Sequence, residues 1–555
     1  EFTAVLVKGR GNYLSRRRLS GATRRAGSLF HREEDLRHLQ QLTDWSRETH
    51  DGSLSDLDFR PGPRVWDEVQ SEHGNCMGRR CPTHQQCFYY AARRRIHNTQ
   101  LLIVNHALFF SDLALRRSGL SMLPDYDAVV IDEAHTMDAA AGSHLGARVS
   151  SSQVDYLLNK LYNDRTNKGL LVHHGWSDCL KRVNHCREQS RDFFNAVTDR
   201  LDPLGGDAQR VSQADPTPNI LGQALEQLAD AVRDRAEQLD DDEEQQDCRS
   251  ACDRAAGLAA EVQAWLRQSM EDSVYWIETS GGRTPRVQLE SAPLDLGPAL
   301  RESLFEQVPS VIMTSATLTV GRERGFEFFK TQIGLSQADE LRLGSPFDYQ
   351  QQARIVLPRG MPDPVRESRE FELKAADAIR SFAGETDGRA FILFTSYQMM
   401  RNVERALRPW LTQRNLAVLM QGEGLPRGRM LERFKANPRC LLLGTDSFWQ
   451  GVDVPGDALQ LVVIAKLPFS VPDHPLLSAR LDAVRRGGGN PFLEYQLPEA
   501  VIRLKQGFGR LIRSKTDTGT VVILDPRITS KPYGRVFLDS LPDCEVLRPH
   551  LASLE

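Results

Sequence analysis

Short apolar runs, each ended by polar or glycine residues, recur along the sequence and constrain its fold more than any other feature. They lie at 127–131, 311–313, 390–394, 441–443, 461–464 and 521–524. Stretches with helical periodicity separate them, for example 366–382 and 397–410. Strands that alternate with helices form parallel sheets with helices on both faces. The sequence therefore predicts an α/β fold, in which the run at 127–131 is buried on both faces of a parallel sheet.

A different texture from about 145 to 272 interrupts this alternation. Apolar residues at Leu221, Leu225, Leu228 and Val232 follow a helical period, and the acidic run at 240–244 is typical of a solvated loop. We expect a mostly helical insertion here.

The composition excludes several classes of protein. Of the 555 residues, 40% are hydrophobic and 26% are charged, which excludes collagen, coiled coil and wholesale disorder. No apolar stretch reaches the roughly 20 residues of a membrane span, and no signal-peptide pattern opens the sequence. Nine cysteines do not form a dense disulfide framework in a chain of this length, so we expect a cytoplasmic protein.

Nucleic-acid binding would depend on local basic patches, because the net charge is −4. Residues 8–25 and 76–97 each contain several Lys or Arg and no acid. Such clusters either follow a phosphate backbone or form a solvated face. The aromatic residues 88–90 beside the second cluster either stack on bases or belong to a core.

Two motifs are suited to phosphoryl transfer. Asp132 and Glu133 directly follow an apolar strand, at the edge where α/β sheets place their ligands. The first carboxylate can hold Mg²⁺ through water, and the second can activate an attacking water. In the motif Gln506-Gly-Phe-Gly-Arg510-Leu-Ile-Arg513, the two arginines would share a helix face and could clamp a triphosphate. The structural alternatives are an ordinary acidic turn and a solvated helix.

Two further polar segments follow predicted strands. The glycine-punctuated loop at 444–456 includes Asp453, and its backbone could contact phosphate or nucleic acid. The segment 314–318 places three hydroxyls, including those of Ser315 and Thr317, directly after a strand. They could equally be helix caps.

Taken in order, these motifs resemble those of superfamily-two helicases: DEAH at 132–135, SAT at 315–317, GTD…GVD at 444–453 and QGFGRLIR at 506–513. Their details resemble the XPD/DinG family of iron–sulfur DNA helicases, over nearly the whole chain. Further matching marks are KGRGNY at 8–13, VNHAL at 104–108, SPF at 345–347, FWQGVD at 448–453 and KLPF at 466–469. Tyr533-Gly534 resembles the bacterial DinG-like branch.

The resemblance implies an ATP-dependent DNA helicase with two RecA-like motor domains that bind ATP and Mg²⁺. It also implies 5′ to 3′ movement on single-stranded DNA and the unwinding of forked DNA in repair or replication. Asp132 would hold Mg²⁺, Glu133 would serve the attacking water, and His135 would couple the site to Ser315 and Thr317. From the second motor domain, the site would receive Gln506, Arg510 and Arg513, while Asp453 would link nucleotide state to DNA grip.

The resemblance also implies a division into parts. We expect a remnant of motor domain one at 1–9, a cluster-type insertion at 10–97, motor domain one with DEAH at 98–144, a helical arch at 145–275, the end of motor domain one with the SAT motif at 276–339, and motor domain two at 340–555.

A helicase needs a glycine-rich loop that ends in Gly-Lys-Ser/Thr to hold the nucleotide phosphates. The dipeptide Gly-Lys occurs nowhere in the sequence, which begins at Glu1 and not at methionine. We therefore expect the phosphate loop upstream of Glu1, and a chain that is inactive by itself.

Cys76, Cys81 and Cys87 lie within twelve residues, a spacing that suggests a metal or cluster site. The resemblance makes them three ligands of a [4Fe-4S] cluster, with Ser15 at the fourth position. Serine oxygen is a poor substitute for a soft thiolate. A zinc site with His73 or His84, or plain reduced thiols, are the alternatives.

Two other functions compete with the helicase. A non-catalytic DNA-binding scaffold, related to helicases but inactive as an ATPase, would also lack the phosphate loop. An iron–sulfur redox protein would leave DEAH and QGFGRLIR unexplained.

Overall fold

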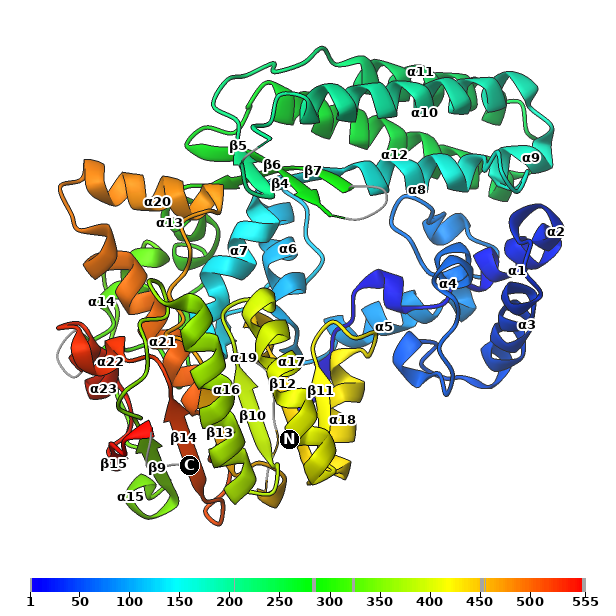
Figure 1. Cartoon of the computed structure of the whole chain (residues 1–555). Helices are drawn as coiled ribbons and strands as arrows, with labels where there is room; N and C mark the ends of the chain where they lie inside the picture. The colour runs from blue at the N-terminus through cyan, green and yellow to red at the C-terminus, as the bar shows by residue number, and fades with distance from the viewer. Residues whose placement is uncertain are drawn as a thin grey trace. The chain divides into compact units, whose positions relative to one another are not determined.

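The computed structural model describes residues 2–203, 205–281, 286–321, 325–449, 454 and 456–551 (Figure 1). Contacts within the chain divide it into two compact units. One unit comprises residues up to Val129, Thr136–Val311 and Asp473–Ala479, and the other comprises Val130–His135, Ile312–Pro472 and Arg480–Glu555. Across the described residues, no helix is long and apolar enough to cross a membrane.

A seven-stranded parallel sheet forms the centre of the second unit. Its strands, in spatial order, are β11 (Ala417–Met420), β12 (Cys440–Gly444), β10 (Ala390–Leu393), β13 (Leu461–Ile464), β14 (Gly519–Ile523), β9 (Ala353–Val356) and β15 (Glu545–Leu547). The strands predicted at 390–394, 441–443, 461–464 and 521–524 all belong to this sheet. The predicted α/β class is therefore confirmed.

Helices cover both faces of this sheet because successive strand residues point to opposite sides. Ala390 and Ile392 pack in one core with α16 (Ser368–Glu385) and α17 (Tyr397–Arg414), the two helices in front of the sheet in Figure 1. Phe391 and Leu393 pack in the core of the other face. That core includes residues of α18 (Arg427–Ala436), α19 (Asp446–Trp449), α21 (Leu497–Phe508) and α23 (Gly534–Ser540).

The strand that precedes the DEAH motif is not buried as predicted. Among the described residues, β3 (Ala128–Ile131) pairs only with β8 (Ser310–Met313), and Val130 is 66% exposed. A two-stranded sheet leaves most of its apolar surface uncovered, so the expectation of burial on both faces is wrong for these residues. A second such pair joins β1 (Ala4–Leu6) to β2 (Leu101–Ile103).

The insertion after residue 145 is mostly helical, as expected, but it also contains a sheet. Its helices are α8 (Ser151–Leu161), α9 (Leu170–His174), α10 (Ser177–Thr198), α11 (Ile220–Ala236) and α12 (Asp242–Leu266). Leu221, Leu225, Leu228 and Val232 lie in its core, which confirms the helical period. An antiparallel sheet of β4 (Ala147–Ser150), β7 (Arg286–Pro293), β6 (Ser273–Ser280) and β5 (Ala208–Arg210) was not predicted.

The cluster-type segment has a small core of its own. Its helices are α1 (Arg16–Arg24), α2 (Ala26–Leu29), α3 (Glu33–Glu48), α4 (Pro63–Val69) and α5 (Phe88–His97). Leu14, Leu42 and Val65 are fully buried in this core, and Phe88 packs there as well. Two further helices, α6 (His106–Arg116) and α7 (Met137–Leu145), come after this segment in the sequence. The domain boundaries expected from the sequence stay predictions.

Candidate functional site

The turn that carries the DEAH motif is held in an unusual backbone conformation. Glu133 has φ of 48°, in the left-handed region that residues other than glycine seldom adopt. Asp132 stabilises this turn, because its Oδ1 accepts hydrogen bonds from Glu133 N at 2.9 Å and from Thr314 Oγ1 at 3.1 Å. Such conformations often occur at functional sites. The turn presents the Glu133 carboxylate at the surface, with its side chain 58% exposed.

The SAT segment contacts the DEAH motif through hydroxyl groups. His135 Nδ1 lies 2.8 Å from Ser315 Oγ and 3.3 Å from Thr317 Oγ1. Ser315 Oγ also donates to Glu133 Oε2 at 3.2 Å. The structure thus brings together the residues for which the resemblance implied coupling, and their role stays a prediction.

Glu133 is held in its charged form. The pKa of its carboxyl is lowered first by the hydrogen bond from His135, whose Nδ1 lies 3.3 Å from Oε2, and then by Ser315 and the positive charge of Arg510. Partial burial opposes this shift without reversing it. An ionised carboxylate is the form that can accept a proton from water.

The amide of Gln506 is buried. Gln506 lies in α21 and is only 4% exposed, yet neither Oε1 nor Nε2 has a hydrogen-bond partner among the described residues. In the same part of the chain, Nε2 of His135 is also buried without a partner. Buried polar atoms nearly always find partners, so groups left unsatisfied require an explanation such as an absent ligand.

The two arginines of the third motif do not share a helix face as predicted. The helix α21 ends at Phe508 with Gly509 as its C-cap, so Arg510 and Arg513 lie beyond it. Arg510 Nε donates to Gln506 O at 2.9 Å. Arg513 N donates to Asp517 Oδ2 at 2.8 Å, and this carboxylate closes the following turn.

Gly507 lies where other parts of the protein approach the helix backbone closely. A Cβ at this position would lie 3.0 Å from the ring of Trp449 and 3.1 Å from Leu393. The glycine therefore allows α21 to pack tightly on α19 and on the sheet. Asp453, the third predicted coupling residue, lies outside the described residues.

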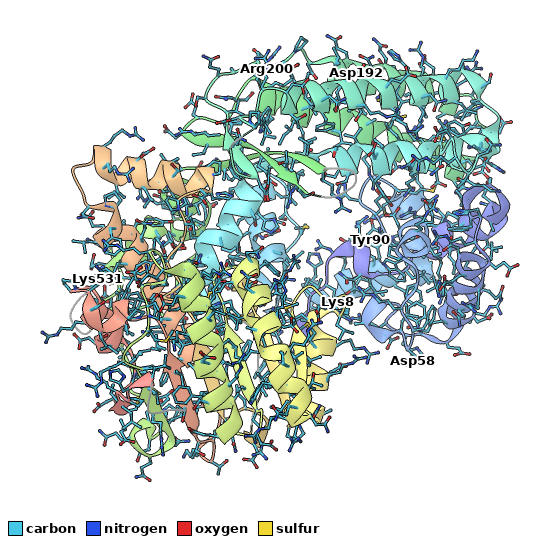
Figure 2. The ribbon with its side chains drawn as sticks, viewed as in Figure 1. Lys8, Asp58, Tyr90, Asp192, Arg200 and Lys531 are labelled. Carbon is cyan, nitrogen blue, oxygen red and sulfur yellow. The ribbon has the colours of Figure 1, made fainter. Side chains whose placement is uncertain are left out.

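The three cysteines do not assemble a metal site in the described parts of the chain. No group of three or more His, Cys, Asp or Glu side chains there is placed to hold a metal ion. Cys76 Sγ instead lies 3.9 Å from the hydroxyl of Tyr90 (labelled in Figure 2), and Cys81 Sγ lies 3.4 Å from Thr83 Oγ1. The arrangement does not show the cluster ligand set or the zinc alternative with His73 or His84, and both stay predictions.

Ser15 has a structural role at the position of the expected fourth ligand. Its hydroxyl oxygen is the N-cap of α1 and accepts from Arg18 N at 3.4 Å. Ser, Thr, Asp and Asn are the residues that fit this position. The helix cap thus accounts for a serine at position 15 without a role in metal binding.

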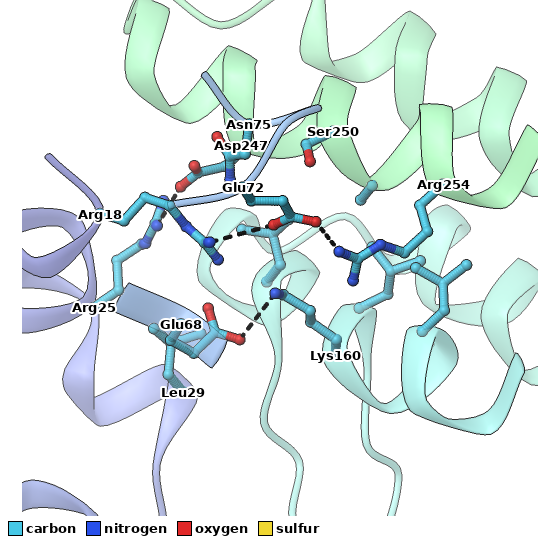
Figure 3. A pocket seen from close by; sticks show the side chains of 14 residues that line it. Arg18, Arg25, Leu29, Glu68, Glu72, Asn75, Lys160, Asp247, Ser250 and Arg254 are labelled. Atoms are coloured by element: carbon cyan, nitrogen blue, oxygen red, sulfur yellow. Dashed lines mark hydrogen bonds and ion pairs between the residues drawn. The ribbon is translucent and has the colours of Figure 1, made fainter. Parts of the chain in front are cut away.

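A network of buried and half-buried charges joins the cluster-type segment to the arch helices, and the sequence did not reveal it (Figure 3). Asp247 of α12 pairs with Arg25 and with Arg17 Nη1 at 3.2 Å. Glu72 pairs with Arg18 at 3.2 Å and with Arg254. In sequence these residues look like ordinary solvated charges, and only the fold brings them together.

Sequence comparisons agree with this geometry. Residues 379–544 match the family described as Helicase C-terminal domain, and residues 75–154 match DEAD_2. The chain is 34% identical to the ATP-dependent DNA helicase YoaA of Escherichia coli, over 97% of this chain and 81% of the relative. It is 30% identical to the ATP-dependent helicase DinG of Mycobacterium tuberculosis H37Rv, over 97% of this chain and 80% of the relative.

Solved structures show the same fold. A structure titled XPD_Helicase superposes with a TM-score of 0.58 at 13% identity, over 99% of this chain and 87% of the other. A second, titled XPD_APO, gives 0.55 at 14% identity over 81% of this chain and 82% of the other. The ordered motifs, the parallel sheet and these relatives together show that the chain belongs to the XPD/DinG-like family of DNA helicases.

Proposed function

We propose that this protein is an ATP-dependent DNA helicase in which Glu133 activates the water that attacks ATP. One observation carries the proposal: an ionised Glu133, hydrogen-bonded by Ser315, lies within the influence of Arg510, which contacts Gln506, and the amide of Gln506 is buried with no partner among the described residues. A nucleotide phosphate or its attacking water would satisfy that amide.

Each residue of the site has a different role in the proposed reaction. Asp132 would hold Mg²⁺ through water, and the ion would offset charge on the phosphate oxygens. Glu133 would accept the proton of the attacking water, while His135 keeps its carboxylate charged and oriented. Arg510 and Arg513 would offset the charge that develops on the transferring phosphoryl group.

Single-stranded and forked DNA are the proposed substrates, with 5′ to 3′ movement and a role in repair or replication by resemblance to the family. The exposed Arg79, Arg80 and Arg94 of the cluster-type segment support DNA binding. Arg95 is less suited because it pairs with Asp51 at 3.0 Å. The cofactors of the proposal are ATP and Mg²⁺, and no group of side chains among the described residues supports adding an iron–sulfur cluster to them.

ATP turnover by the full-length protein tests the proposal. We expect hydrolysis that depends on single-stranded DNA, and a fall of about 10²–10⁴-fold in kcat for Glu133→Gln with ATP binding retained. Glu385→Gln, at an exposed glutamate, is the control. Absence of DNA-dependent hydrolysis together with tight DNA binding would favour the non-catalytic scaffold.

The 555 residues alone are proposed not to turn over ATP at a helicase-like rate. They contain no Gly-Lys-Ser/Thr loop, and the remaining groups cannot position the γ-phosphate without one. Robust DNA-stimulated hydrolysis by the 1–555 chain would contradict this part of the proposal.

A further inference from the structure

A half-buried lysine connects two of the motifs described above. Lys505, the residue before Gln506 in α21, directs its Nζ to the segment that follows the SAT motif. It donates to Thr319 O at 2.9 Å and lies 3.5 Å from Thr319 Oγ1. We infer that Lys505 is a positioning residue whose ammonium fixes α21 to the segment that carries Ser315 and Thr317. This inference rests on the proposed function, because it concerns the same site.

The charge of Lys505 is placed unfavourably. Burial, followed by the nearby positive charge of Arg342, lowers the pKa of Lys505 to about 8. Among the described residues, no carboxylate forms an ion pair with it. Burying an ammonium without a carboxylate costs free energy, and an apolar side chain of similar length would avoid that cost. A lysine at this place therefore requires a reason other than packing.

Apolar packing already holds the far end of the SAT segment. Val320 is 1% exposed and lies in the same core as Leu504 and Phe508 of α21. Gly321 N also donates to Ser540 Oγ at 2.8 Å. The contact at Thr319 is nearer to the site than these, only two residues from Thr317. The Lys505 contact therefore sets the position of α21 along the segment after the SAT motif, whereas apolar packing holds the two together.

The position of α21 along this segment determines where the Gln506 amide lies relative to Glu133. Thr317 Oγ1 contacts His135, which in turn contacts Glu133, while Gln506 follows Lys505 directly in the helix. Catalytic groups misplaced by about 1 Å can lower a rate about 10²-fold. Loss of the Lys505 contact should therefore lower kcat and leave the KM for ATP nearly unchanged, because Lys505 is not proposed to touch the nucleotide.

The test uses Lys505→Met, with Lys505→Arg as the conservative variant and Lys531→Met as the control at an exposed lysine (Figure 2). We expect kcat for DNA-stimulated ATP hydrolysis to fall at least about tenfold in Lys505→Met and to recover in Lys505→Arg, which keeps a charged donor. The midpoint of urea unfolding should not fall in Lys505→Met. Unchanged kcat in Lys505→Met, or a loss explained by a lower unfolding midpoint, would overturn the inference.

Hydrogen exchange separates this inference from the proposed function. Amides of residues 317–320 should exchange faster in Lys505→Met than in the unsubstituted protein or in Lys531→Met, whether or not the protein hydrolyses ATP. Equal exchange in all three proteins would by itself overturn the inferred role of the Lys505 contact. An unsubstituted protein without DNA-dependent hydrolysis, but with the expected exchange difference, would overturn the ATPase proposal and support the contact.

Discussion

The region around α21 and the charged network beside α12 both bury polar side chains, but they satisfy them differently. In the network, Asp247 and Glu72 each pair with two arginines. In α21 and the DEAH turn, the amide of Gln506 and Nε2 of His135 are buried with no partner among the described residues. Buried charges that pair with one another stabilise an arrangement of the chain, whereas unpartnered buried groups indicate the place of a ligand.

The two regions also differ in how the sequence presents them. The residues around α21 belong to short motifs with a recognisable order, whereas those of the network are scattered from Arg17 to Arg254 without a motif. Residues that bind a ligand must present particular chemical groups, so they form recognisable motifs. Residues that only join two segments need complementary charges where the segments meet.

The largest effect that this comparison predicts is expected on substitution of Gln506. Gln506→Ala should lower kcat about 10²–10³-fold, the usual cost of removing one preorganised polar group from a transition state. It should change stability little, because the substitution leaves no hydrogen-bond partner unpaired in the part of the chain that the structure describes. Steady-state ATPase assays and urea unfolding measure the two effects.

Gln352 is the matched control for this prediction. It is also buried, but its Nε2 donates to the carbonyls of Ser514 and Asp517, each at 2.9 Å. Gln352→Ala should therefore lower the free energy of unfolding by about 1–3 kcal/mol. If the two variants behaved alike, the distinction between ligand-facing and structural polar groups would fail here.

The next effect concerns the stability of the network. Asp247→Ala should lower the free energy of unfolding by about 3–5 kcal/mol, because Arg17 and Arg25 would remain buried without their carboxylate. Glu243→Gln, at the more exposed pair with Arg24, should cost about 1 kcal/mol or less. Urea unfolding measures both, and equal effects would show that burial does not set the strength of these pairs.

A pH series should distinguish the lysine of α21 from the paired arginines. The pKa of Lys505, about 8 in the folded protein, lies below its usual value of roughly 10.4. Between these values the unfolded chain binds a proton that the folded one lacks, so this group makes the free energy of unfolding rise with pH. The slope should be at most about 1.4 kcal/mol per pH unit. Lys505→Met should abolish it, and an equal slope in both proteins would contradict the assignment.

The smallest expected effect is at Ser15. Ser15→Ala should lower the free energy of unfolding by about 1 kcal/mol through loss of the α1 cap. Iron and sulfide content after anaerobic purification should not depend on this substitution, because the oxygen serves the helix. Loss of iron in Ser15→Ala would restore Ser15 as a cluster ligand and make the cluster-type segment a ligand-binding region after all.

Much of the fold could be predicted because its signals are local. Runs such as 390–394 and 461–464 have the composition of buried parallel strands, and the period of α11 follows from four apolar residues. The burial of β3 was predicted wrongly because burial depends on which strands and helices cover a sheet. The helical face shared by Arg510 and Arg513 was wrong because the helix ends at Phe508.

The sequence by itself determined the class of fold and the kind of chemistry, since strand patterns and ordered motifs are local properties of the chain. Only the tertiary structure decided which polar groups meet. The contacts of His135 with Ser315, of Lys505 with Thr319 and of Asp247 with Arg17 and Arg25 join residues far apart in sequence. Their energies depend on distance and burial, which no local pattern specifies.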